Sequence, residues 1–277
     1  MRVSLASLLF LALFTLPARA EDPKLPPLVA QGRDADPHRY QFALDKGAQI
    51  LPTSDGKSFY ILWLPETKKG AEHPPMIATI HGHDGFAFNE FFLWYPEAKK
   101  RGMGILAIQW WLGKGERPQD YLSPDEVYAV VEDVFEKEGM MEGSSLFHGF
   151  SRGSANSYAV GANDTHSGKR YFSLFVANSG KPSLDYPPNM AIERGEYGEK
   201  PLTGTHWVTY AGAKDTNPER DGFEGMRGAG EWIRQHGGVV DLALEDPNGD
   251  HGGFHKNPAN MAKALECFEK RLHAKGK

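Results

Sequence analysis

The sequence has little cysteine and no excess of basic charge. Its 277 residues include one cysteine, Cys267, which excludes a disulfide within the chain and a cysteine-rich zinc site. The 31 Lys and Arg residues stand against 36 Asp and Glu residues, and this formal net charge of −5 does not favour a nucleic-acid partner. A hydrophobic content of 40% argues against a disordered chain. We therefore expect a folded protein that binds no nucleic acid.

Long apolar runs are scarce, and the one that exists lies at the N-terminus. Residues 3–16 are apolar, Arg2 precedes them, and Ala18-Arg19-Ala20 follows as an A-x-A cleavage site. The run is shorter than the ~20 residues that a membrane-spanning helix needs. We predict that residues 1–20 are a signal peptide, that the mature protein is secreted or periplasmic, and that it has no membrane segment after cleavage.

The rest of the chain alternates apolar runs with amphipathic patterns. The predicted strands span residues 59–64, 76–80, 104–110, 145–150, 172–178, 206–211 and 239–244. Between them, Ser123-Pro124-Asp125-Glu126 is a capping box that predicts a helix start, and a terminal helix is predicted to begin near Pro258. Short unbroken apolar strands that alternate with helices are typical of a mostly parallel sheet with helices on both faces. The sequence predicts an α/β fold.

We expect one domain. No repeat or linker divides residues 40–277. Residues 21–39 are polar and rich in proline, and we predict an extended lead-in on the surface there. Residues 181–203 are rich in Pro, Gly and charge, which favours an insertion or a lid at one edge of the sheet.

A G-x-S-x-G motif is formed by Gly149, Ser151 and Gly153. The motif alone is weakly specific, but here an apolar strand precedes it and small residues lead into a predicted helix. A serine on such a strand–turn–helix bend exposes its hydroxyl as a nucleophile, and the glycines allow the close packing that the bend requires. An ordinary glycine turn is the alternative.

This motif, in its context, resembles the α/β-hydrolase superfamily from about residue 59 to residue 272, with the nearest resemblance to secreted feruloyl esterases and polyhydroxyalkanoate depolymerases. The resemblance implies a triad in the order Ser, Asp or Glu, His. Asp215 follows the strand 206–211, and His251 lies on a glycine-rich loop after the last strand. Ser151, Asp215 and His251 are therefore the predicted catalytic residues, with Asp221 and His255 as alternatives for the acid and the base.

The resemblance also implies an oxyanion hole. The strand 76–80 ends in His81-Gly82, and in the superfamily the backbone N–H after such a pair and the N–H after the nucleophile bind the oxyanion. The corresponding donors here are His83 and Arg152. The sequence lacks the glycine-rich HGGG pattern, which disfavours esters of bulky tertiary alcohols. The Arg152 side chain is free to hold a substrate carboxylate or to pair with an acid.

These observations predict a serine carboxylesterase that acts through an acyl-enzyme on a small or polymeric ester such as an aryl, acetyl-sugar or polyester substrate. We expect no cofactor and no metal. Three alternatives stay open: a serine peptidase of the same fold, a non-catalytic binding protein, and a metal-dependent hydrolase that uses the histidines of His81-x-His83-Asp84 and His251/His255. Trp110-Trp111 either form an aromatic wall beside the site or pack at the end of the sheet.

Overall fold

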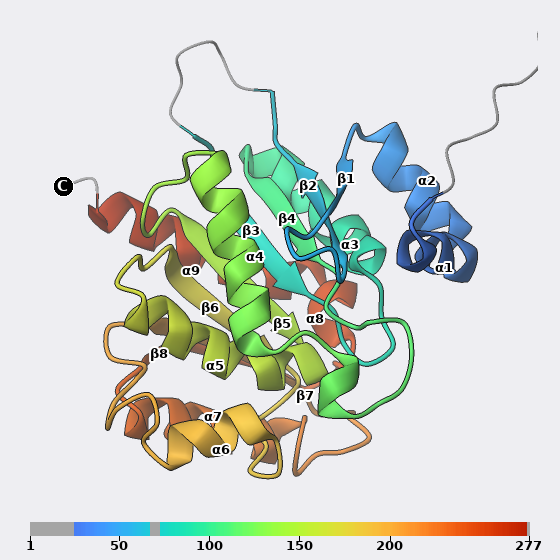
Figure 1. The fold of residues 1–277 in the computed structure, drawn as a ribbon. Helices are drawn as coiled ribbons and strands as arrows, with labels where there is room; N and C mark the ends of the chain where they lie inside the picture. Colours follow the sequence, from blue (N-terminus) through green and yellow to red (C-terminus); the bar gives the residue numbers. More distant parts are fainter. Residues whose placement is uncertain (1–24, 67–72, 276–277) are drawn as a thin grey trace, which may run out of the picture.

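The computed structural model describes residues 25–66 and 73–275, and these residues form an eight-stranded sheet flanked by helices (Figure 1). The strands are β1 (Gln49–Pro52), β2 (Phe59–Trp63), β3 (Met76–Ile80), β4 (Gly104–Ile108), β5 (Ser145–Phe150), β6 (Phe172–Asn178), β7 (His206–Gly212) and β8 (Val239–Asp246). The helices are α1 (Pro27–Ala35), α2 (Pro37–Asp45), α3 (Ala87–Arg101), the short 3-10 helix η1 (Pro118–Asp120), α4 (Pro124–Lys137), α5 (Arg152–His166), α6 (Pro187–Glu193), α7 (Phe223–Gln235), α8 (Gly253–Lys256) and α9 (Pro258–Lys275).

The order of strands in the sheet is β1-β2-β4-β3-β5-β6-β7-β8. Strand β2 pairs antiparallel with both β1 and β4, and the pairs from β4 to β8 are parallel. The carboxyl ends of β3 to β8 therefore meet at one edge of the sheet. In open α/β sheets this is the edge at which ligands bind.

The central strands form because their residues can be buried on both faces. Every residue of β3, β4 and β6 is buried, as an unbroken apolar run in a parallel sheet predicts. The predicted bounds of β3, β5 and β6 are confirmed. Strand β4 ends at Ile108, two residues before its predicted end, and β8 continues to Asp246.

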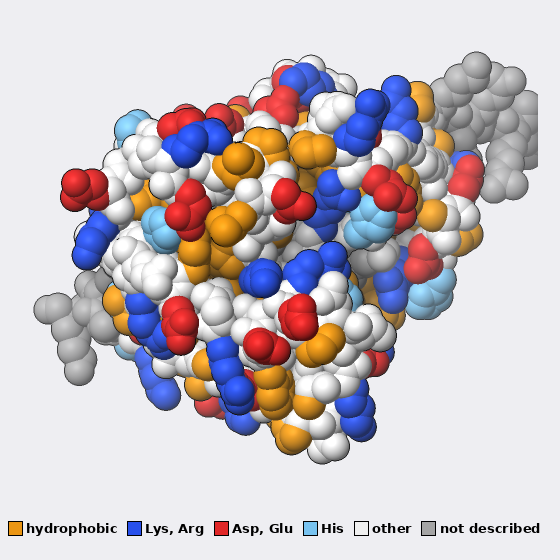
Figure 2. Space-filling view, turned by 90° about the horizontal axis from the view of Figure 1, so that it is seen from below, with side chains coloured by type: hydrophobic (Ala, Val, Ile, Leu, Met, Phe, Trp, Pro, Cys, Tyr) orange, Lys and Arg blue, Asp and Glu red, His pale blue; other side chains and the backbone are white. Residues whose placement is uncertain are grey.

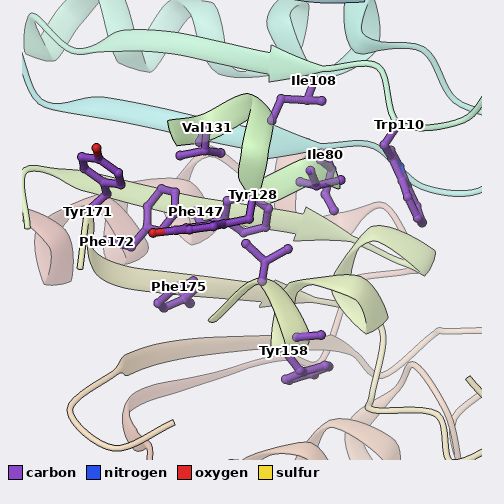
Figure 3. Packing of buried hydrophobic residues seen from close by; sticks show 14 of the residues in the cluster. Ile80, Ile108, Trp110, Tyr128, Val131, Phe147, Tyr158, Tyr171, Phe172 and Phe175 are labelled. Carbon is purple, nitrogen blue, oxygen red and sulfur yellow. The ribbon is translucent and has the colours of Figure 1, made fainter. Parts of the chain in front are cut away.

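The core consists of two hydrophobic layers, one on each face of the sheet. Helices α4, α5, α6 and α7 bury side chains in the first layer, where Val131, Phe147 and Tyr158 lie between α4, α5 and the strands (Figure 3). Helices α1, α2, α3, α8 and α9 contribute to the second layer, which includes Phe91 and Phe268. The capping box predicted for α4 is present, because the Ser123 hydroxyl accepts from the Glu126 N–H.

The prediction of an extended lead-in over residues 21–39 is wrong where the structure describes it. Helices α1 and α2 occupy most of this segment, and Pro27 and Pro37 each stand at the first position of a helix. Proline is favoured there because its missing N–H would lack a helical partner anyway. Buried Val29 and Ala43 anchor the two helices in the second layer.

The remaining predictions on the chain's organisation have mixed outcomes. The predicted signal peptide, residues 1–20, lies outside the described residues. The segment 181–203 contains α6, whose Ile192 is buried against α5, so it is not an irregular loop throughout. Among residues 25–66 and 73–275, no helix is long and apolar enough to span a membrane.

Candidate active site

Ser151 stands at a strained turn between β5 and α5. Its φ of 53° and ψ of −115° are unusual for a residue with a side chain, and its N–H donates to the Asn178 carbonyl oxygen at 2.8 Å. Two glycines make the turn possible. A Cβ on Gly149 would lie 2.3 Å from the Gly153 carbonyl oxygen, and a Cβ on Gly153 would lie 2.6 Å from the His81 carbonyl oxygen. The motif is therefore more than an ordinary glycine turn.

His251 and Asp215 complete a hydrogen-bonded chain that starts at Ser151. The Nε2 atom of His251 lies 2.9 Å from the Ser151 Oγ atom, and its Nδ1 atom lies 2.7 Å from Oδ2 of Asp215. The Asp215 side chain is 1% exposed, and its other oxygen accepts from the Asn217 N–H at 2.9 Å. Because the carboxylate accepts from Nδ1–H, the Nε2 atom is left to accept the serine proton.

The alternative acid lies beside the triad but has another partner, and the alternative base lies in a different cluster. Asp221 accepts two hydrogen bonds from the Arg220 Nε and a third from its Nη2, so its carboxylate is occupied by a guanidinium. His255 lies beside Glu90, with Nε2 3.8 Å from Oε2. The structure thus brings the first-choice residues Ser151, Asp215 and His251 together, and it places His255 in a different cluster.

The two predicted oxyanion donors flank this chain. Arg152 is the first residue of α5, where a helix leaves its N–H groups without helical partners. The loop that carries His83 adjoins Ser151, since a Cβ on Gly82 would lie 3.3 Å from the Ser151 Cβ. Within the described part of the chain, neither backbone N–H donates to a protein acceptor. Both remain free to bind a developing negative charge.

Solved structures with a similar backbone include several esterases. The chain aligns with an esterase from Pyrobaculum calidifontis at 14% identity and a TM-score of 0.59, over 91% of this chain and 95% of that one. A fungal esterase from Rhizomucor miehei aligns at 14% identity and a TM-score of 0.60, over 93% and 94%. An acylaminoacyl peptidase from Pyrococcus horikoshii aligns at 14% identity and a TM-score of 0.57, over 80% of this chain and 40% of the peptidase.

The chain has the α/β-hydrolase fold. No protein-family model matches the sequence, and a search of curated proteins finds no relative. The structural likeness therefore establishes the fold, and the chemistry of the site has to be derived from the residues themselves.

In this α/β-hydrolase fold, Ser151 borders a cavity of about 440 Å³ at the carboxyl edge of the sheet. A volume of this size suits a small-molecule substrate. The cavity is lined by His83, Glu116, Ser151, Arg152, Ala155, Gly180, Lys181, Ser183, Asp185, Tyr186, Arg220 and Asp221. Several of them belong to the segment 181–203, so the start of this segment forms one wall of the site.

Trp110 packs at the end of the sheet and does not line the cavity. Its side chain is 1% exposed, and its Nε1–H donates to the His81 carbonyl oxygen at 2.8 Å, which fixes the loop after β3. Trp111 is half-buried against Phe86. The structure thus supports the packing role of Trp110 and Trp111, and not an aromatic wall beside the site. Tyr186 is the aromatic side chain that lines the cavity.

Three groups of side chains in the described residues have the spacing to hold a metal ion. They are Glu90, His148 and His255; His83, Asp84 and Glu116; and Asp215, Asp221 and His251. The histidine clusters inferred from the sequence are split, because His251 and His255 belong to different groups and His81 belongs to none. The His81 Nδ1 atom contacts the Gly82 carbonyl oxygen, and burial lowers the pKa of His81 to about 4. The structure therefore does not bring together the histidines on which the metal-hydrolase alternative was based.

Sequence reasoning missed a buried polar network behind Ser151. His148 lies in the middle of β5, with Nδ1 3.3 Å from the Glu90 carboxylate and Nε2 3.1 Å from the Asn178 side chain. The Thr79 hydroxyl donates to the Glu90 carboxylate at 2.9 Å. Since the Asn178 carbonyl oxygen accepts from the Ser151 N–H, this network supports the strained turn. The one available signal was a histidine and a glutamate inside otherwise apolar elements.

Proposed function

We propose that the protein is a serine carboxylesterase. The observation that carries this proposal is the hydrogen-bonded chain Ser151–His251–Asp215, which starts at a strained serine that borders a cavity. His251 accepts the Ser151 proton as Oγ attacks the ester carbonyl, and Asp215 holds the imidazole in the required tautomer and stabilises its cation. The N–H groups of His83 and Arg152 bind the oxyanion, each contributing about 3–4 kcal/mol to the transition state.

The acyl-enzyme is then hydrolysed. His251 gives its proton to the alcohol oxygen as the ester C–O bond breaks, which releases the alcohol and leaves the acyl group on Ser151. His251 next removes a proton from water, whose oxygen attacks the acyl carbonyl. Collapse of the tetrahedral intermediate returns the proton to Ser151 and releases the carboxylic acid. The residues named supply every proton transfer in this cycle.

The test is hydrolysis of p-nitrophenyl acetate and butyrate by residues 21–277, with and without EDTA. We expect turnover that EDTA leaves unchanged and that Ser151→Ala lowers by about 10⁶-fold. Ser157→Ala is the matched control, because its hydroxyl is buried nearly two turns further along α5 and, among the described residues, donates to the Ser154 carbonyl oxygen alone. Activity in Ser151→Ala that EDTA abolishes would instead assign the reaction to a metal.

A serine peptidase is the second candidate, favoured by the alignment with the Pyrococcus acylaminoacyl peptidase. The same triad cleaves amides when a site holds the peptide on both sides of the bond. N-acetyl-alanine p-nitroanilide beside N-acetyl-alanine p-nitrophenyl ester separates the two activities. An esterase hydrolyses the ester alone, whereas comparable kcat/KM values for both compounds would favour the peptidase.

The acyl and alcohol groups belong to a finer proposal. The sequence resemblance to feruloyl esterases and polyhydroxyalkanoate depolymerases favours aryl, acetyl-sugar or polyester substrates. A panel of methyl ferulate, acetylated xylose and polyhydroxybutyrate ranks these classes by kcat/KM. If the enzyme hydrolyses the small esters but releases no soluble product from polyhydroxybutyrate, the result would contradict depolymerase activity.

We also propose export. Residues 1–20 carry the basic end, the apolar run and the A-x-A site of a cleaved leader. Expression of the full chain in a Gram-negative host, followed by fractionation and intact-mass measurement, tests this. The expected product begins at Glu21 and lies in the periplasmic fraction. A full-length cytoplasmic product would contradict it.

A further inference from the structure

The cavity beside Ser151 is rich in charge. Three of its lining residues, Arg152, Lys181 and Arg220, are cationic, and the acids Glu116, Asp185 and Asp221 also border it. Figure 2 views the molecule from the lower side of Figure 1 and shows Lys and Arg side chains near the middle of that face, with Asp, Glu and His side chains among them. Which of these charges are compensated decides what the cavity attracts.

The charge of Arg220 is neutralised within the protein, because the Arg220 guanidinium makes hydrogen bonds of 2.7–3.0 Å to the buried Asp221 carboxylate. The carboxylates of the other two acids form no ion pair with Arg152 or Lys181. The Asp185 carboxylate accepts from the Ser183 hydroxyl. The Glu116 side chain is 76% exposed and lies 3.7 Å from His83.

Arg152 has no such partner. No carboxylate of the described residues lies within 4.0 Å of its guanidinium. The guanidinium carbon instead lies 4.2 Å from the centre of the Tyr121 ring, Nη1 lies 3.3 Å from Nδ1 of His83, and Nη2 donates to the Glu116 carbonyl oxygen. These contacts, none of which is to a carboxylate, fix the position of the guanidinium without cancelling its charge. A guanidinium has five N–H donors, and these contacts use two of its nitrogens.

Lys181 is the second uncompensated cation. Its Nζ atom donates to the Glu219 carbonyl oxygen at 2.9 Å, and within residues 25–66 and 73–275 no carboxylate lies within 4.0 Å of it. Lys181 follows Gly180, at which an added Cβ would lie 2.2 Å from the Ser151 carbonyl oxygen, and Lys181 lines the same cavity as Ser151. Two fixed positive charges therefore border the same cavity as the serine.

We propose that the site takes esters whose acyl or alcohol part carries a free carboxylate, which Arg152 and Lys181 bind. The inference rests on the proposed esterase function and names its substrate class. A carboxylate accepts hydrogen bonds from a guanidinium in a forked geometry and from an ammonium as a point charge. Because the Arg152 N–H also serves the oxyanion, one residue ties the substrate's charged group to the position of its scissile carbonyl.

Two pairs of esters test this proposal, and each pair differs only in one charge. The acyl pair is p-nitrophenyl hydrogen glutarate and its methyl ester, and the alcohol pair is 4-acetoxybenzoate and its methyl ester. We expect the anionic member of one pair to have a kcat/KM at least about tenfold higher, after subtraction of spontaneous hydrolysis. Added 0.5 M NaCl reduces that preference, because salt screens partly exposed charges. The pair that shows the preference assigns the carboxylate to the acyl or the alcohol side.

Variants identify the residues. In Lys181→Met and in Arg152→Met, the ratio of the anionic to the neutral kcat/KM falls toward one, with each variant serving as its own reference. Lys200→Met is the matched control, because Lys200 is an exposed lysine of the same segment that does not line the cavity. Circular dichroism shows whether each variant folds, and Lys181→Met still tests the proposal if Arg152→Met does not fold.

The outcomes separate the two proposals. Equal kcat/KM values within both pairs, with turnover that depends on Ser151, overturn the anionic preference and leave the esterase in place. The same anionic preference in Lys181→Met, Arg152→Met and the wild type overturns the assignment to these two residues. A lack of turnover of all four esters overturns the esterase and, with it, this proposal.

Discussion

The molecule holds two carboxylate–histidine pairs of the same chemistry in different surroundings. In the pair Asp215–His251 the imidazole side chain is 34% exposed and its far nitrogen faces the Ser151 hydroxyl. In the pair Glu90–His148 both side chains are at most 2% exposed, and the far nitrogen faces the Asn178 amide. A carboxylate beside a histidine is therefore not sufficient to make that histidine a catalytic base. Solvent exposure of the imidazole and an adjacent nucleophile distinguish the first pair from the second.

Burial also changes what the second pair does to stability. Burial alone raises the pKa of Glu90, but the hydrogen bond and charge of His148, the charge of His255 and the Thr79 hydroxyl outweigh it and lower the pKa to about 2. Glu90 is therefore an ionised, hydrogen-bonded group inside the core. An ionised group in the core lowers the free energy of unfolding if it loses its partner. We therefore expect the pair Glu90–His148 to matter for stability, whereas the pair Asp215–His251 is proposed to matter for catalysis.

The largest expected effect comes from the exposed pair. His251→Ala removes the proposed base, and we expect kcat for p-nitrophenyl acetate to fall by about 10⁶-fold, as removal of a triad base does in serine hydrolases. The urea midpoint should stay close to that of the wild type because His251 is only partly buried. A variant that keeps more than about a hundredth of the activity would show that another group accepts the Ser151 proton.

Asp215→Asn sharpens the same side of the comparison. The amide keeps the shape of the side chain but favours the wrong tautomer of His251, so we expect kcat to fall by about 10⁴-fold. The control is Asp221→Asn, which loses the ion pair to Arg220 and leaves the hydrogen bond between Asp215 and His251 in place. A larger loss of kcat in Asp221→Asn than in Asp215→Asn would reverse the assignment of the acid.

The buried pair should respond in stability. Glu90→Gln removes the charge that faces His148 and His255, and we expect the free energy of unfolding to fall by about 3–5 kcal/mol. Urea denaturation measures the change. Glu196→Gln is the matched control, because the ion pair between Glu196 and Arg194 is 55% and 54% exposed and contributes about 0–1 kcal/mol. Equal effects of the two substitutions would show that the buried network contributes little.

The contrast also explains which parts of the molecule the sequence predicts. The bounds of β3, β5 and β6 and the capping box at Ser123 follow from local patterns, and the residues 151, 215 and 251 follow from their positions after strands. The buried network does not, because Glu90 lies far from β5 in the sequence and only the sheet order brings its helix beside His148. Helices α1 and α2 do not follow from the proline-rich composition of residues 21–39, because it is the position of each proline at the first turn that is compatible with a helix.

The smallest of these effects is the dependence of stability on pH, and it arises from histidines that the fold seals from water. Burial and the charge of His148 lower the pKa of His255 to about 3, although the Glu90 charge opposes them, and burial lowers the pKa of His81 to about 4. The ordinary pKa of histidine is about 6.5. Below that pH the unfolded chain binds protons that the folded chain does not bind, so stability falls as the pH falls.

As the pH falls from 7 to 4.5, each of these two histidines should lower the free energy of unfolding by about 2–3 kcal/mol. His255→Gln should remove one such contribution, so urea titrations at the two pH values should give a difference smaller by about that amount than in the wild type. The range from pH 7 to pH 8 serves as the internal control, since both states hold this imidazole neutral there. An unchanged difference in His255→Gln would mean that His255 takes up a proton while the protein stays folded, and that the fold does not seal this imidazole from water.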